Sequence, residues 1–186
     1  MSPRCTSPRA PGGGLRLGFL GCTRGAVAVE YALLLPAMVS ALLGAVETFQ
    51  AVQAYSKAVS AAQTVADLSA RADSHSGATL AAIATAAQRV MDPLPSTTAS
   101  MGIRVESVVF AANGTATAQW GYSWGSGADP VPLSKVTGLG KAGESVVTVS
   151  FRYAHAPLLH DLLGTLTFRE TAVARPRVTR VIPFSG

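Results

Sequence analysis

The residue of greatest chemical interest in this sequence is Glu30, a carboxylate placed inside an apolar run. The run extends from Ala26 to Val46, and its exceptions to apolar character are Glu30, Pro36, Ser40 and Gly44. A stretch of about 20 apolar residues is long enough to cross a bilayer as a helix. A charged side chain costs about 2.5–3.5 kcal/mol at the centre of such a helix and less near its edge. An acid at this position therefore indicates that the protein uses it.

Four arginines precede the apolar run and predict its orientation. Residues 1–25 contain no acid, and their basic residues are Arg4, Arg9, Arg16 and Arg24. A positively charged flank stays in the cytoplasm, so everything after Phe49 is expected on the other side of the membrane. Of the formal charge of +5, four positive charges lie in this segment, which leaves only +1 for the rest. The basic balance of the whole chain therefore does not indicate nucleic-acid binding.

Other readings of the N-terminal segment stay open. A secretory signal places a short apolar region and a cleavage site after its basic residues. Here, a long apolar run follows the last arginine instead. The sequence Phe19-Leu20-Gly21-Cys22 leaves a lipoprotein signal as one alternative, and an uncleaved signal anchor is another. Cys5 and Cys22, the two cysteines of the chain, both precede Gly25. A chain that begins after Gly25 would therefore fold its exported domain without disulfides.

The order of these features resembles a type IV prepilin of the Flp, or tight-adherence, subfamily. The features are a basic leader, Gly25, four small apolar residues, Glu30-Tyr31 and an apolar helix. In that family a membrane aspartic prepilin peptidase cuts after the glycine of a Gly-x-x-x-x-Glu-Tyr/Phe motif. The resemblance thus implies a processing site between Gly25 and Ala26, with Glu30 and Tyr31 as the motif. It also implies that Glu30 pairs with the free amino terminus of a neighbouring subunit during assembly.

The length of the chain indicates which proteins of this subfamily it resembles most. The Flp major pilin is tiny, whereas residues 50–186 form a large domain here, as in the TadE-like minor pseudopilins. The resemblance is strongest over residues 22–70 and weaker in the strand pairs that end in Arg175-Pro176-Arg177. It implies a subunit that takes part in Flp-type pilus assembly at the bacterial inner membrane and supports adhesion and biofilm formation. Its partners would be the bilayer, the prepilin peptidase, and other pilus subunits and assembly proteins.

The helix that begins in the apolar run is expected to continue beyond the membrane. Residues 49–71 contain no glycine or proline and many alanines. Such a composition favours helix. An apolar stripe is predicted to pack against the protein's own domain rather than against a coiled-coil partner. It consists of Val52, Tyr55, Val59, Ala62 and Ala66. A second helix is predicted over residues 79–91, ending before Asp92-Pro93.

Four later segments alternate between apolar and polar residues, which is typical of an antiparallel sheet with one covered face. The predicted strands are residues 103–111, 115–122, 145–153 and 165–174. The side chains expected on a common face are Ile103, Val105, Val109 and Ala111; Ala116, Ala118, Trp120 and Tyr122; Val147, Val149, Phe151 and Tyr153; and Leu166, Phe168, Ala172 and Ala174. Asn113-Gly114 predicts a two-residue hairpin loop between the first two strands.

The predicted fold class is α+β. A long N-terminal helix, with a membrane-spanning half and an amphipathic half, packs on a roughly four-stranded antiparallel sheet. The predicted organisation is a cleaved leader over residues 1–25, a transmembrane helix over residues 26–49 and a periplasmic domain over residues 50–186.

No set of residues indicates an enzyme, so no catalytic residue, cofactor or metal site is expected. His155, His160 and Asp161 are close in sequence but lack a further ligand at a clear metal-site spacing. Residues 137–141 lack the full spacing of a phosphate-binding loop. Two alternatives to the pilus role remain, an uncleaved membrane-anchored extracytoplasmic binding module and a periplasmic enzyme on a membrane tether. The N-terminal residue of the membrane-extracted protein distinguishes the first of these from a processed pseudopilin.

Overall fold

The computed structural model describes residues 23–158 and 164–185, with the backbone alone for residues 23–26 and 28. Most of the predicted leader therefore lies outside the described residues. The elements, in chain order, are α1 (Thr23–Arg71), α2 (Gly77–Met91), β1 (Met101–Phe110), β2 (Ala116–Gly125), the 3₁₀ turn η2 (Leu133–Lys135), β3 (Ser145–His155) and β4 (Leu166–Ala174). The chain divides after Val46 into two compact units, which are described separately below.

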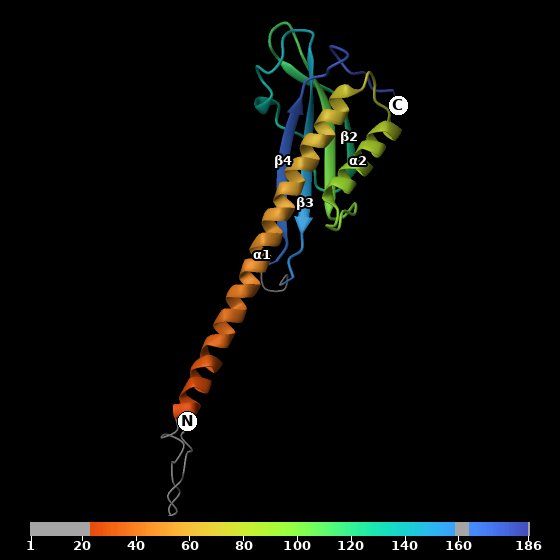
Figure 1. Ribbon diagram of the computed structural model, residues 1–186. Helices are drawn as coiled ribbons and strands as arrows, with labels where there is room; N and C mark the ends of the chain where they lie inside the picture. Colours follow the sequence, from red (N-terminus) through yellow and green to blue (C-terminus); the bar gives the residue numbers. More distant parts are fainter. Residues whose placement is uncertain (1–22, 159–163, 186) are drawn as a thin grey trace, which may run out of the picture. The chain divides into compact units, whose positions relative to one another are not determined.

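The domain that begins at Glu47 contains the sheet, and its α+β class is confirmed. The described strands form one antiparallel sheet in the order β2-β1-β3-β4 (Figure 1). The two central strands, β1 and β3, pair over nearly their whole length, from Met101 opposite Tyr153 to Val109 opposite Ser145. All four predicted strands are confirmed, each with its ends moved by up to three residues.

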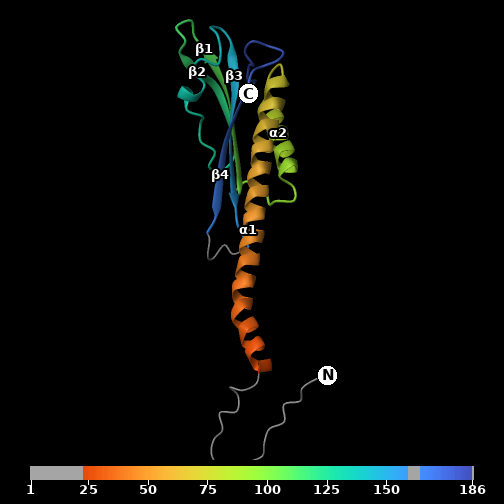
Figure 2. The ribbon, with the colours of Figure 1, turned by 60° about the vertical axis from the view of Figure 1, so that its left-hand side comes forward.

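Both helices of this domain cover the same face of the sheet (Figure 2). The side chains of α2 in this core are Leu80, Ala84, Ala87 and Met91, and those of β3 are Val147, Val149, Phe151 and Tyr153. The predicted cover of the sheet by α1 is therefore confirmed, and α2 adds a second covering element. A capping box formed by Ser76 and Thr79 fixes the start of α2. It does so because it satisfies backbone N–H groups that have no partner within the helix.

The buried face of α1 differs from the predicted stripe. Val52 is 58% exposed and Tyr55 is 47% exposed, although Ala62 and Ala66 are buried as expected. The face that packs on the sheet is made mostly of alanines, namely Ala54, Ala58, Ala61, Ala62, Val65 and Ala66. The small side chains of this face leave room for the large side chains of β3, which explains why the alanines of α1 face the sheet.

The first hairpin and the strand after it also differ in detail from the prediction. The backbone N–H of Ala111 donates to the carbonyl of Thr115 (2.9 Å), so the loop is three residues long and Gly114 takes a positive φ of 80°. A bulge at Gln119 then places Trp120 opposite Ser107 but Ala118 opposite Val108. One inserted residue moves the side chains before it to the other face of a strand. Ala116 and Ala118 therefore do not share a face with Trp120 and Tyr122.

A small second core on the opposite face of the sheet was not predicted. Val108, Phe110 and Val146 pack there against Val136, which follows η2 in the loop after β2. The loop approaches the sheet closely at Gly140, where an added Cβ would lie 2.3 Å from the Phe110 ring. Val109 lies on the same face of β1 as Ile103 and Val105, as predicted, but it is not part of the main core.

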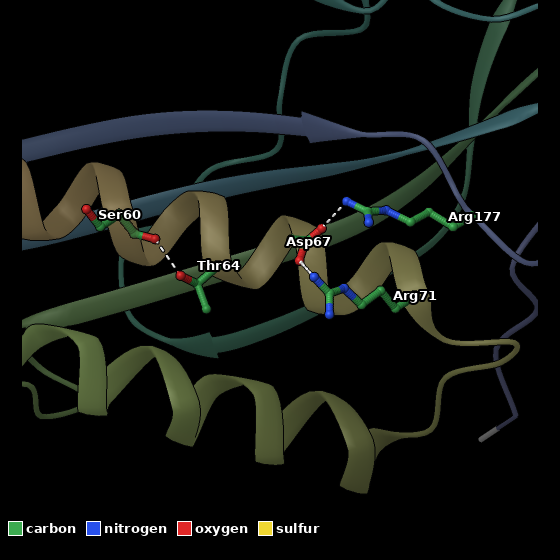
Figure 3. Close-up of polar contacts among 5 residues, drawn as sticks. All are labelled: Ser60, Thr64, Asp67, Arg71 and Arg177. Atoms are coloured by element: carbon green, nitrogen blue, oxygen red, sulfur yellow. Dashed lines mark hydrogen bonds and ion pairs between the residues drawn. The ribbon is translucent and has the colours of Figure 1, made fainter.

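The segment after β4 holds the C-terminal end of α1 against the domain. Arg177 donates from its backbone N–H to the carbonyl of Ala70 (2.9 Å), and its guanidinium pairs with Asp67. Asp67 also pairs with Arg71, so one carboxylate holds two arginines (Figure 3). Nearby, the hydroxyl of Thr64 donates to the carbonyl of Ser60 (2.8 Å) within α1. Exposed ion pairs each contribute at most about 1 kcal/mol, so these set the position of the tail more than its stability.

Candidate functional site

The N-terminal part of α1 exposes large apolar side chains along its length. In the unit that ends at Val46, the exposed residues include Leu33, Leu35, Met38 and Leu42. One helix in the described part of the chain is long and apolar enough to cross a membrane, and it includes this segment. Apolar surface of this extent is unfavourable in water. The predicted apolar span is thus present as a single helix that could cross a bilayer.

Glu30 and Tyr31 both lie on the surface of this helix. Tyr31 is 67% exposed, and it lies in an exposed apolar stripe with Leu35, Met38 and Leu42, which follow at helical spacing. Glu30 is exposed as well, and it makes no hydrogen bond or ion pair with any of the described residues. Its carboxylate is therefore available to a group on another molecule. The structure places the two motif residues next to each other but brings no further polar residue to them within the described part of this unit.

The predicted processing site lies at the start of α1. The helix begins at Thr23, three residues before the predicted start, so the Gly25–Ala26 bond falls in its first turn. The first four N–H groups of a helix have no partner within it, and helix ends fray. The bond is therefore in the part of α1 that opens most easily.

The His155 ring lies at the end of β3, beside a cavity of about 220 Å³. His155 is 4% exposed, and its Nε2 atom has no hydrogen-bond partner among the described residues. The neighbouring Tyr153 lines the same cavity, and burial raises the pKa of its phenol above the ordinary value of 10.0. His160 and Asp161, the other members of this predicted sequence cluster, lie outside the described residues. Within residues 23–158 and 164–185, no group of three or more metal-ligating side chains occurs.

A second histidine, His75, anchors the C-terminal tail. The ring donates from Nε2 to the carbonyl of Ser69 (2.9 Å) and packs edge-on against Trp120. Its backbone pairs with the tail on both sides, from His75 N to Pro183 O (3.0 Å) and from Ser185 N to His75 O (2.8 Å). Trp120 donates its indole N–H to the carbonyl of Ile182 (2.7 Å). Both side chains therefore help to hold the C-terminal tail against the domain.

A half-buried ion pair on the other face of the sheet was missed by sequence reasoning. Arg104 and Glu106 stand two residues apart on β1, and the Arg104 Nη2 atom lies 2.8 Å from Glu106 Oε1. Gly121 lies opposite Glu106 on β2, and a Cβ there would come within 3.2 Å of the Arg104 guanidinium. The available signal was the spacing of opposite charges at positions i and i+2, which places both on one face of a strand. The Arg104 guanidinium also donates to the Ser123 hydroxyl on β2 (3.1 Å), so these contacts lie within the sheet itself.

Comparison with known proteins agrees with the geometry of α1. Residues 25–67 match the family described as TadE-like protein. The match begins at Gly25, includes Glu30 and Tyr31, and extends through the apolar span into the part of α1 that packs on the sheet. No curated protein and no solved structure gives a significant match to the chain. The chain is therefore similar to TadE-like proteins over its N-terminal helix, which is consistent with a TadE-like protein of the Flp/Tad pilus system.

Proposed function

We propose that this protein is a minor pseudopilin that takes part in the assembly of a Flp-type pilus and thereby supports adhesion and biofilm formation. The observation that carries the proposal is the TadE-like match over residues 25–67, which coincides with a helix whose first half exposes its apolar side chains. The protein is a scaffold and not an enzyme in this proposal. Its partners are other pilus subunits and assembly proteins.

The proposed topology follows from the charges around the apolar span. The leader with its four arginines lies in the cytoplasm, the span crosses the bacterial inner membrane once, and the domain lies in the periplasm. A prepilin peptidase removes the leader after Gly25, which gives Ala26 a free ammonium group. Glu30 stays exposed on the helix and pairs with the ammonium of a neighbouring subunit, because opposite charges attract strongly where water is scarce.

Deleting the gene tests this function directly. We expect the deletion strain to lose most of its Flp-type filaments, counted by electron microscopy, and most of its surface-attached biomass. Expression of the wild-type chain should restore both, and so should expression of Val178→Ala, which shortens an exposed side chain in the segment after β4. Normal numbers of filaments and normal attachment in the deletion strain would show that the protein does not serve pilus assembly.

A further inference from the structure

The domain that begins at Glu47 has one end at which α1 enters, here named the entry end. α1 and β4 run in the same direction along the domain, because Tyr55 packs on Phe168 (5.9 Å between ring centroids) and Asp67, further on, pairs with Arg177. The start of β4 therefore lies at the entry end (Figure 2). The end of β3 lies there too, since His155 is paired with Leu166.

The entry end exposes apolar side chains from three separate elements. Phe49 on α1 is 68% exposed, Leu158 after β3 is 67% exposed and Leu166 at the start of β4 is 38% exposed. The opposite end differs in chemistry, because the segment after β4 exposes Arg175, Arg177 and Arg180 there. The domain therefore exposes three large apolar side chains at the end where α1 enters and three arginines at the other end.

The chain itself indicates what covers the entry end. α1 runs without interruption from Thr23 to Arg71, and the apolar run ends at Val46, immediately before the domain. Phe49 follows Val46 by three residues, which is about 4.5 Å along a helix. A bilayer has a hydrocarbon core about 30 Å thick and measures about 40–45 Å with its headgroup regions. A domain that starts with no linker after a spanning segment has its entry end within the headgroup region.

We propose that the entry end is a lipid-binding surface: Phe49, Leu158 and Leu166 insert into the headgroup region of the leaflet that faces the domain. The inference rests on the proposed membrane anchoring of residues 26–46. Transfer of apolar and aromatic side chains from water to this depth lowers the free energy. The expected partner is a neutral or zwitterionic lipid surface, since the three inserting side chains carry no charge. The domain then rests on the membrane with its entry end, and the end that carries the three arginines points away from the membrane.

Site-directed spin labelling of the full chain in phosphatidylcholine nanodiscs tests this proposal. Cys5 and Cys22 are replaced by serine, so that each variant carries a single nitroxide. The test positions are Leu158→Cys and, independently, Leu166→Cys. Leu42→Cys reports on the apolar span and Val178→Cys on the other end of the domain, and both of these side chains are exposed. The measurement is the ratio of collision rates with oxygen, which partitions into lipid, and with a neutral nickel chelate, which stays in water.

The proposal predicts a ratio at Leu158 and Leu166 that is severalfold higher than at Val178 and lower than at Leu42. A ratio at both test positions equal to that at Val178, with a lipid-like ratio at Leu42, would overturn the proposed contact of the domain with lipid. The membrane anchoring of the apolar span would still hold. Protection of both test positions from oxygen and nickel alike would show that protein covers this end, which also overturns the proposal. A water-like ratio at Leu42 would instead show that the anchoring on which the inference rests is wrong.

Discussion

Replacing Glu30 by glutamine is expected to reduce strongly the co-assembly of this protein with other pilus subunits. The side chain is exposed on α1 and makes no hydrogen bond or ion pair with the described residues, so the substitution leaves the fold of its own chain unchanged. It keeps the size and hydrogen-bonding capacity of the side chain but removes its charge. Cross-linking to other subunits should fall about tenfold or more, because a charge pair in a region of low dielectric constant is lost.

The matched control for this substitution is Ser40→Ala. It removes another polar group from the same apolar run, but the Ser40 hydroxyl already donates to the carbonyl of Pro36 (2.8 Å) within the helix. We therefore expect Ser40→Ala to insert and assemble as the wild type does. Membrane insertion and cleavage should survive in both variants. If Glu30→Gln cross-links and supports attachment at wild-type levels, charge pairing with a mature amino terminus is not the role of this residue.

Truncation of the core is expected to have the largest effect on stability. Phe151 is fully buried at the centre of the sheet, in the core shared with α1 and α2. Phe151→Ala should lower the free energy of unfolding by about 3–5 kcal/mol, since it removes apolar contacts and leaves a cavity. A domain of ordinary stability unfolds with only about 5–15 kcal/mol. Both cysteines precede Gly25, so after cleavage no disulfide would offset the loss.

Urea unfolding of the detergent-solubilised protein measures this loss, with the fluorescence of Trp120 and Trp124 as the signal. Val178→Ala is the control, because its side chain is 62% exposed. Truncation of a surface side chain changes the free energy of unfolding by only about 0.5 kcal/mol. We expect a much lower midpoint for Phe151→Ala and an unchanged midpoint for the control. Equal midpoints for Phe151→Ala and the wild type would show that the sheet face under α1 is not the stabilising core.

The sequence was sufficient to predict the elements of this fold but not how each one faces its neighbours. Alternation along β3 predicted the side chains of its main-core face correctly, because large apolar residues at every second position leave one register open. It did not reveal that Val146, on the other face, is buried in the second core. In α1, alanines occur on many sides of the helix, so the few larger residues suggested a face that overlaps the buried face only in part. Val52 and Tyr55 lie at the surface, and Ala54 and Ala58 lie in the core.

Long-range features were beyond sequence reasoning for a different reason. The bulge at Gln119 depends on how β1 pairs with β2, and no local pattern in β2 reveals it. The burial of Ile182 in the main core and the pairing of His75 with Pro183 join segments that are far apart in the chain. By contrast, the motif at Glu30 was recognisable, since it depends only on the order of neighbouring residues. The TadE-like match over residues 25–67 supports this part of the interpretation.

The most direct test of the whole account is the intact mass of the protein extracted from membranes of cells that contain an active prepilin peptidase. We expect the mass of a chain that begins at Ala26 and ends at Gly186, and we expect Gly25→Leu to retain the leader because the larger side chain blocks the peptidase. Gly21→Leu, at a second leader glycine, should be cleaved normally, whereas it would disturb a lipoprotein signal at Cys22. A wild-type mass that still includes residues 1–25, in cells where another prepilin is processed, would contradict the account and favour an uncleaved membrane-anchored binding module.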